Sequence, residues 1–185
     1  LGGGSDQNYT MIARCGADLA WIVDYDEIVP LLHAVHRALI LESPTPEEFV
    51  ERWTEEAAQG SIDIVRRHEA GSARLDDMVK IYVKYRKKLL EHFRAISARK
   101  QGGKPATWLA DPVDYERIRG MFMAGRIRPM LGNLLADGAI SGIGDSARDL
   151  GVPIRVIYLT NVEELVTYND AMKQSFRSLP VDDRS

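Results

Sequence analysis

The segments GGGSDQN, residues 2–8, and LAWIVD, residues 19–24, predict how this chain begins to fold. The second segment is a short, continuous apolar run that ends at Asp24, which is typical of a buried strand in a parallel sheet. The first segment is a glycine-rich turn that enters a helix-like pattern. A glycine turn, a helix and a strand with an acidic end are typical of a nucleotide-binding βαβ unit. We therefore expect backbone amides and the Asp24 carboxylate to meet in one crevice.

Two further segments have the composition of strands. Residues 154–159, IRVIYL, form a second continuous apolar run, and residues 127–131, IRPML, form a weaker one that Pro129 interrupts. Helix-like patterns over residues 28–41 and 137–150 separate these runs. Strands that alternate with helices predict the α/β fold class. We expect these runs to form a Rossmann-like, mostly parallel sheet, either a complete one or an incomplete one.

The long stretch between the first strand and the weaker one is helical in character. Thr45 begins a capping box with proline at the first helical position, and Ser61 is expected to cap a helix over residues 62–68. Apolar residues at spacings of three and four predict the longest helix, from Leu75 to about Arg99. The expected organisation is a first part of the Rossmann-like domain, a helical insertion or lid, and a second part of the domain: residues 1–42, 43–125 and 126–185.

Composition restricts the kinds of partner and compartment. The chain has 185 residues, of which 45% are hydrophobic, enough for one ordinary domain with a buried core. A net charge of −3 gives no overall attraction to nucleic acid or to anionic membranes, so we expect neither as a partner. The single cysteine, Cys15, cannot form an internal disulfide, and no signal-like or membrane-spanning segment is evident, which together predict a cytoplasmic protein.

Chemistry in such a fold is expected where strands end and helices begin, because exposed amides and helix N-termini face the crevice there. The glycine run at residues 2–8 meets that description. Asp24 follows it at the end of a strand, where a carboxylate can accept hydrogen bonds from ribose hydroxyls. The same glycine-rich composition also occurs in flexible linkers, which is the alternative interpretation of the run.

Two later turns carry polar residues at predicted strand ends. Gly132 and Asn133 follow the weaker strand, and Asn161 and Glu163 follow the stronger one. An asparagine and a glutamate at a strand terminus can orient a nucleophile or accept a proton. They can equally begin a helix, with Asn161 as N-cap and Glu163 in the first turn, where the helix dipole favours an acidic residue. Both interpretations stay open at this point.

Five runs together resemble a bacterial family described as methyltransferase-like. These are GGGSDQNYTMIA at residues 2–13, LAWIVDYD at residues 19–26, IRPMLGNL at residues 127–134, PIRVIYLTNVEEL at residues 153–165 and FRSLPVDDRS at residues 176–185. The resemblance depends on the order of these runs and on the less common sequences DQNY and YLTNVEE. The family is similar in layout to class I S-adenosylmethionine-dependent methyltransferases.

That resemblance implies S-adenosylmethionine as the cofactor. It implies that Gly2 and Gly4 face the methionine end of the cofactor, with Asp6 belonging to the same cofactor-binding turn. Asp24 would then bind the ribose hydroxyls. Hydrogen bonds from ribose hydroxyls to a carboxylate are an ordinary way to hold a nucleoside.

The resemblance also assigns roles to the later turns. It implies that Gly132 and Asn133 lie near the adenine, and that Asn161 and Glu163 border the transfer site as catalytic residues. The helical insertion, residues 43–125, would act as a lid and as the pocket for a small-molecule or peptide acceptor.

Two other functions are compatible with the same residues. A NAD(P)-dependent oxidoreductase would use the same glycine turn, although Gln7 stands where its third glycine would be. A non-catalytic interaction module would use the apolar stripe between Met78 and Ile96 for self-association into a homo-oligomer. Binding of each cofactor and the molecular mass in solution distinguish these three alternatives.

Two short patterns suggest a metal but favour other interpretations. His33 and His36 stand three residues apart on a predicted helix, and the surrounding leucines and valines favour burial of both against the sheet over metal binding. The sequence Asp24-Tyr25-Asp26 has the form of a metal-nucleotide motif, but so short a pattern arises easily by chance. We therefore expect no metal site.

Overall fold

The computed structural model describes the whole chain except residues 1, 3–4, 136–137, 160–168 and 184–185. The described part is a mixed α/β structure with eight helices and four short strands. In chain order these elements are α1 Gln7–Arg14, β1 Ala20–Asp24, α2 Ile28–Leu41, α3 Pro46–Glu51, α4 Ala58–His68, α5 Leu75–Ser97, β2 Lys100–Gln101, β3 Lys104–Pro105, α6 Pro112–Met123, β4 Ile127–Leu131, α7 Ala139–Asp149 and α9 Asp170–Arg177.

The chain divides into two compact units. The sheet unit comprises Leu1–Gly4, Ala20–Pro30 and Arg128–Ser185, and the helical unit comprises Ser5–Leu19 and Leu31–Ile127. Residues 43–125, which we expected as an insertion, fall inside the helical unit. That unit also takes in residues 5–19 and 31–42, which we had assigned to the Rossmann-like part.

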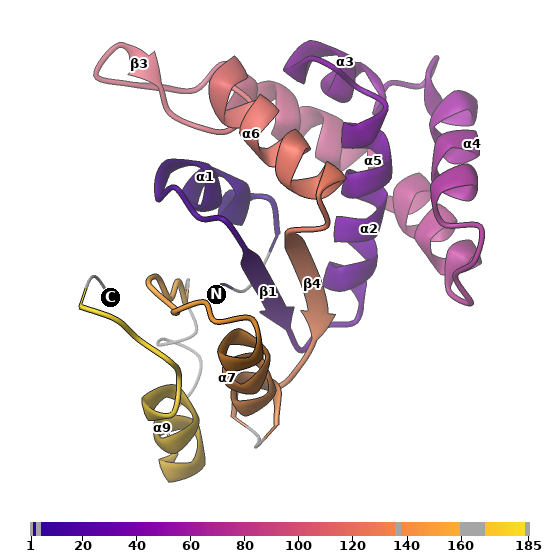
Figure 1. Cartoon of the computed structure of the whole chain (residues 1–185). Helices are drawn as coiled ribbons and strands as arrows, with labels where there is room; N and C mark the ends of the chain where they lie inside the picture. The colour runs from indigo at the N-terminus through magenta and orange to yellow at the C-terminus, as the bar shows by residue number, and fades with distance from the viewer. Residues whose placement is uncertain (1, 3–4, 136–137, 160–168, 184–185) are drawn as a thin grey trace. The chain divides into compact units, whose positions relative to one another are not determined.

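Two parallel strands form the centre of the sheet unit. β1 pairs with β4, and Figure 1 shows both arrows pointing the same way. Gly2 extends this pairing on the other edge of β1, because it forms a parallel bridge with Ile22 and a second parallel bridge with Tyr158. The Gly2 amide donates to the Trp21 carbonyl at 3.0 Å, and the Val23 amide donates to the Gly2 carbonyl at 2.7 Å.

Two of the three predicted strands are confirmed. The predicted strand at residues 127–131 is β4, and the strand predicted from LAWIVD is β1. The run at residues 154–159, the stronger of the two later signals, forms only the single bridge at Tyr158 within the described residues. A strand needs a continuous partner backbone as well as an apolar composition. The described backbone partners of this run are separate instead: Gly2 bridges Tyr158, and the Ile154 amide donates to the Pro180 carbonyl at 2.7 Å. The described residues therefore do not include a complete Rossmann-like sheet.

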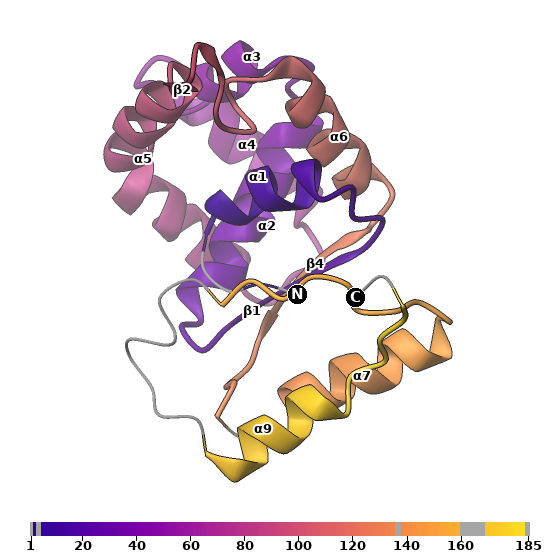
Figure 2. The same cartoon turned by 90° about the vertical axis from the view of Figure 1, so that its left-hand side faces the viewer.

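Two helices pack together in the sheet unit. Figures 1 and 2 both show α7 and α9 side by side, and the two helices contact each other. Their apolar faces bury Ile140, Ile143 and Met172. The α9 helix begins at Asn169, whose side chain accepts a hydrogen bond from the Met172 amide at 2.7 Å, the geometry of an N-cap. This packing gives the sheet unit an apolar core of its own.

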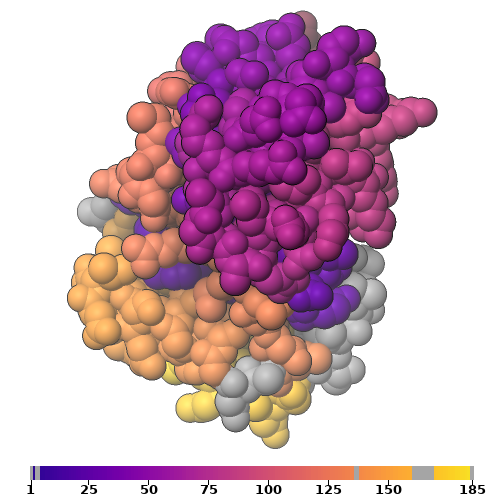
Figure 3. Space-filling view, turned by 90° about the vertical axis from the view of Figure 1, so that its right-hand side faces the viewer, coloured from indigo at the N-terminus to yellow at the C-terminus, as the bar shows by residue number. Residues whose placement is uncertain are grey.

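An aromatic core holds the helical unit together. Its fully buried rings come from four of the helices and from the segments between them: Tyr9, Phe49, Trp53, Tyr82, Phe93, Trp108 and Tyr115. Most neighbouring rings meet edge-to-face or tilted, with centroids between 5.0 and 6.4 Å apart, as aromatic quadrupoles favour. In the space-filling view of Figure 3, residues of α3, α4 and the segment between them cover the face of this unit that is turned toward the viewer.

Local sequence signals explain four of the eight described helix starts, those of α2, α3, α6 and α9. Thr45 caps α3, accepting a hydrogen bond from the Glu48 amide at 3.2 Å, as the capping box predicts. The prediction that Ser61 begins a helix is wrong, because α4 starts at Ala58 and Ser61 lies inside it. The Ser61 hydroxyl instead donates to the Arg52 carbonyl at 2.7 Å, so this buried serine serves packing between segments of the helical unit.

The end of α5 is also explained by sequence. The helix runs to Ser97 and is followed by a hairpin in which β2 and β3 pair antiparallel. Gly102 and Gly103 form its turn with φ values of 57° and 78°. A two-residue hairpin turn with both φ values positive is readily adopted by glycine, which explains why the chain reverses direction here.

Candidate functional site

The carboxyl ends of β1 and β4 meet in the sheet unit. The Gly132 amide, just beyond β4, donates to the Asp24 carbonyl at 2.9 Å. The Asp24 carboxylate accepts the Asp26 amide at 3.0 Å, and the Asp26 carboxylate accepts the Ile28 amide at 2.9 Å, where α2 begins. The two aspartates therefore have different positions, Asp24 at the strand end and Asp26 at the helix start.

Two polar side chains stand beside this strand end. Tyr25, directly after Asp24, is 79% exposed. Asn133 is exposed too, and its side-chain oxygen accepts the Leu135 amide at 2.9 Å, which forms a local turn. The structure thus brings together Asp24, Gly132 and Asn133 of the predicted cofactor-binding set and adds an exposed aromatic ring that the sequence did not single out.

Gly132 is required by packing at this site. A Cβ atom at this position would lie 2.8 Å from the Ala139 Cβ and 2.8 Å from the Val23 Cγ1. Both distances are shorter than real Cβ contacts, and neither neighbour is the far end of a flexible chain. Glycine therefore allows the start of α7 to approach β1 closely, the role that a glycine often has between a strand and the following helix.

We expect Gly132→Ala to lower the free energy of unfolding by about 1–3 kcal/mol, because an added methyl group overpacks the contact between β1 and α7. Gly144→Ala is the matched control, since its Cβ would meet Leu179 at an ordinary 3.4 Å within helix α7. That substitution should be neutral or stabilise the helix by up to about 1 kcal/mol. Urea denaturation followed by circular dichroism measures both, and equal stability of the two variants would contradict the steric argument.

The described structure does not bring together the other residues predicted for the glycine turn and the transfer site. Gly2 lies in the sheet, bridged on both sides, rather than in a turn. Gly4, Asn161 and Glu163 lie outside the described residues. Asp6 belongs to the helical unit, where its side chain is almost fully buried.

Asp6 forms a carboxylate–imidazole pair with His92 on α5. The His92 Nε2 atom lies 3.1 Å from both carboxylate oxygens of Asp6. Burial by itself raises the pKa of Asp6, but the hydrogen bond and charge of His92 outweigh it, so the pKa is lowered. The Trp108 indole also contributes to this lowering, although its N–H makes no hydrogen bond of ordinary geometry. The hydrogen bond to Asp6 in turn raises the pKa of His92.

A second buried cluster joins α1 to α2. The Tyr9 hydroxyl lies 2.5 Å from the His33 Nδ1 atom and 3.3 Å from the His36 Nδ1 atom. Tyrosine has one hydroxyl proton, so it donates to one imidazole and accepts from the other. Burial lowers the pKa of His36 to about 3, and the same cause raises the pKa of Tyr9 well above its usual value. His36 and Tyr9 are therefore neutral, and each can donate or accept a hydrogen bond.

Sequence reasoning identified the burial of His33 and His36 but not their surroundings. Both side chains are buried, as expected, and they contact Tyr9 and the aromatic core of the helical unit. The spacing of the two histidines was the available signal. Nothing local points to Tyr9 as their partner or pairs Asp6 with His92, because these residues are far apart in the chain.

Within the part of the chain that the structure describes, no three histidine, cysteine, aspartate or glutamate side chains are grouped so that they could hold a metal ion. No described helix combines the length and the apolar character needed to cross a membrane. The family model of a domain of unknown function (DUF7790) matches residues 1–185, the whole chain. No curated protein sequence matches the chain significantly.

Proposed function

The chain belongs to the DUF7790 family, a domain family of unknown function. From the residues at the strand ends of its sheet unit, we propose that it is an S-adenosylmethionine-dependent methyltransferase. The proposed cofactor site lies at the carboxyl ends of the strands in the sheet unit, around Asp24 and Gly132. The acceptor is proposed to be a small molecule or a peptide. The exposed and unpaired Cys15 is compatible with action in a reducing compartment such as the cytoplasm.

The order of the parallel segments carries this proposal. Across the sheet the order is β4, β1, Gly2 and Tyr158, since β1 has two edges and pairs with β4 and with Gly2. Along the chain, Gly2 comes first, β1 second, β4 third and Tyr158 fourth. That order reverses between Gly2 and Tyr158, and α/β proteins bind nucleotides at the carboxyl ends of strands where the order reverses. The strand order therefore supports a Rossmann-like half-sheet with a nucleotide site.

The residues at the strand ends fit the nucleoside part of the cofactor. A carboxylate such as that of Asp24 has about four acceptor positions and can accept hydrogen bonds from ribose hydroxyls. The exposed Tyr25 ring has a face on which a purine can stack. The bond that Asn133 accepts from Leu135 uses its oxygen and not its amide hydrogens.

The cofactor, when bound, supplies an electrophilic methyl group on a sulfonium. Two tasks are left to this chain. It has to hold the nucleoside, and it has to place an acceptor in line with the methyl group while excluding water. Asp24 and Tyr25 serve the first task in this proposal. For the second task, Asn161 and Glu163 remain proposals from sequence, where they would orient the acceptor or take its proton.

Replacing Asp24 by asparagine should weaken binding of S-adenosylhomocysteine about 10- to 100-fold, because two hydrogen bonds from ribose hydroxyls to a charged group become weaker or are lost. Isothermal titration calorimetry measures this directly on the purified chain. Asp26→Asn is the matched control, because Asp26 is only two residues away and caps α2, a role that asparagine fills as well as aspartate. The control should bind like the wild type.

Two further arms make this test decisive. Tyr25→Phe should retain binding and Tyr25→Ala should weaken it several-fold, if the exposed ring stacks on adenine. NADH, titrated in the same way, tests the oxidoreductase alternative. No heat with S-adenosylhomocysteine, or equal loss of binding in Asp24→Asn and Asp26→Asn, would overturn the assignment.

The alternative of an interaction module loses its main motivation in the structure. The apolar stripe on α5 is not a free surface, because Met78, Tyr82 and Phe93 are buried within the helical unit. α5 contacts α3 and α4 along this side. The stripe that suggested self-association is thus accounted for by the core of the chain itself.

A further inference from the structure

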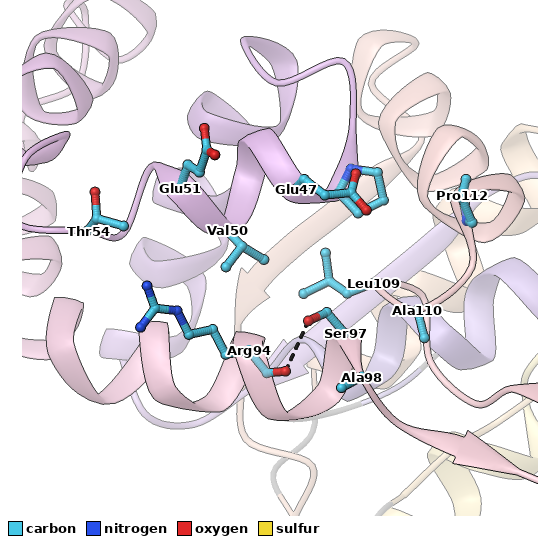
Figure 4. A pocket seen from close by; sticks show the side chains of 11 residues that line it. Glu47, Val50, Glu51, Thr54, Arg94, Ser97, Ala98, Leu109, Ala110 and Pro112 are labelled. Atoms are coloured by element: carbon cyan, nitrogen blue, oxygen red, sulfur yellow. Dashed lines mark hydrogen bonds between the residues drawn. The ribbon is translucent and has the colours of Figure 1, made fainter.

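The helical unit has an open groove of about 390 Å³ between α3, the last turns of α5 and the segment that leads into α6. This volume falls within the roughly 300–1,000 Å³ that is usual for small-molecule sites. The middle of the groove is apolar, since Val50 of α3 and Leu109 of the connecting segment face each other there (Figure 4). Such a surface accepts an aliphatic chain.

Three charged side chains line the same groove. Glu47 and Glu51 come from α3 and Arg94 comes from α5. All three are exposed, and within the described part of the chain none of them forms an ion pair or a side-chain hydrogen bond with another residue. Opposite charges that line one groove without pairing are available to a ligand that carries charges of both signs.

The positions of these groups determine which ligand fits. In Figure 4 the Arg94 guanidinium extends along α5 toward Thr54, below Glu51, while the Glu47 carboxylate lies on the side of Leu109. A cation for a carboxylate therefore lies at one end of the apolar middle, and an anion for an ammonium lies at the other. Glu51 adds a second anion at the end where Arg94 lies.

We propose that this groove binds a free basic α-amino acid of the lysine type. Its carboxylate pairs with Arg94, its α-ammonium group pairs with Glu51, its aliphatic chain lies over Val50 and Leu109, and its terminal ammonium group pairs with Glu47. The ligand carries two cations and one anion, the complement of two glutamates and one arginine. This proposal is independent of the cofactor site, which lies in the sheet unit.

The experiment compares L-lysine with three analogues that each lack one charged group. Norleucine lacks the terminal ammonium, 6-aminohexanoate lacks the α-ammonium, and 1,5-diaminopentane lacks the carboxylate. Titrations of the full chain are followed by the backbone amide signals of groove residues in ¹H–¹⁵N spectra. Each analogue should bind about two- to fivefold more weakly than lysine, the effect expected of one solvent-exposed ion pair.

Three variants assign each preference to one side chain. Glu47→Gln should remove the preference for lysine over norleucine. Glu51→Gln should remove the preference for lysine over 6-aminohexanoate. Arg94→Gln should remove the preference for lysine over 1,5-diaminopentane. These are surface positions, so far-UV circular dichroism should show an unchanged fold. Glu56→Gln is the control, because Glu56 is exposed on the same unit but does not line the groove.

Two results would overturn the proposal. One is an absence of saturable shift changes in the groove with lysine. The other is equal affinity for lysine and all three analogues, which would mean that the charges do not recognise the ligand. Neither result depends on S-adenosylhomocysteine binding, so a failure here is distinguishable from a failure of the proposed methyltransferase.

Discussion

Lowering the pH from 7 to 4.5 should reduce the free energy of unfolding by about 2.5 kcal/mol through His36 alone. Burial among the rings of Phe49, Trp53 and Phe93 disfavours the charged imidazole and lowers its pKa from 6.5 to about 3. Its Nε2 atom has no hydrogen-bond partner among the described residues. The folded protein therefore has no means there of stabilising a proton.

The direction of this pH effect follows from the protonation of His36 in the unfolded and the folded chain. Below pH 6.5 the unfolded chain protonates His36, while the folded chain keeps it neutral down to a pH of about 3. The free energy of unfolding is therefore not reduced by His36 above pH 6.5. It falls as the pH is lowered further, by up to about 5 kcal/mol in total. The lowered pKa of Asp6 adds a loss of the same sign at still lower pH. His92, with a raised pKa, has the opposite effect and costs stability as the pH rises above 6.5.

Urea denaturation at pH 7 and at pH 4.5 measures this dependence in the wild type and in His36→Asn. Asparagine places an amide near the position of the imidazole Nδ1 atom, so it can keep the hydrogen bond with Tyr9 but does not titrate. The variant should lose about 2.5 kcal/mol less between the two pH values. His68→Asn is the control, since His68 lies beside Glu42 outside this cluster. An unchanged pH dependence in His36→Asn would contradict the role of burial.

Replacing Trp108 by alanine should lower the free energy of unfolding by about 3–5 kcal/mol, the cost of removing a fully buried large side chain. The indole contacts three rings of the helical unit. It stacks on Tyr115 with centroids 5.7 Å apart and meets Tyr9 and Phe49 at 5.0 and 5.5 Å. Because these rings come from three separate segments of the chain, the loss affects the packing of the whole unit.

Trp108→Phe tests how much of this cost comes from losing the aromatic ring altogether, since the indole N–H group makes no hydrogen bond with the described residues. Phenylalanine retains an aromatic ring in the same place, so its cost should be clearly smaller than that of alanine. Urea denaturation followed by circular dichroism provides both values. A Trp108→Ala variant within about 1 kcal/mol of the wild type would show that the aromatic cluster can collapse around the missing ring.

The secondary structure that sequence predicted well depends on residues close together in the chain. The strands at β1 and β4, the helix α2 and the cap at Thr45 all follow from apolar periodicity or from a side chain that bonds an amide three residues away. The turn at Gly102 and Gly103 follows from the backbone freedom of glycine. These preferences act locally, so the sequence expresses them directly.

What the structure added comes from residues far apart in the chain. The run at residues 154–159 has the composition of a strand, but its ladder depends on what lies opposite, and the described residues form a single β-bridge there, between Gly2 and Tyr158. Asp6 meets His92 and Tyr9 meets two histidines of α2 because the aromatic core brings α1, α2 and α5 together. No pattern within a few residues encodes such contacts.

The amino-acid order of this chain was thus sufficient for the identity of its main helices, for two of its strands and for the acidic strand end at Asp24. The neighbours of each strand, the partners of its buried histidines and the charged groove between α3 and α5 were decided only when the chain folded. Local structure reflects the conformational preferences of adjacent residues, whereas these contacts reflect the burial of apolar surface and the pairing of polar groups across the whole domain.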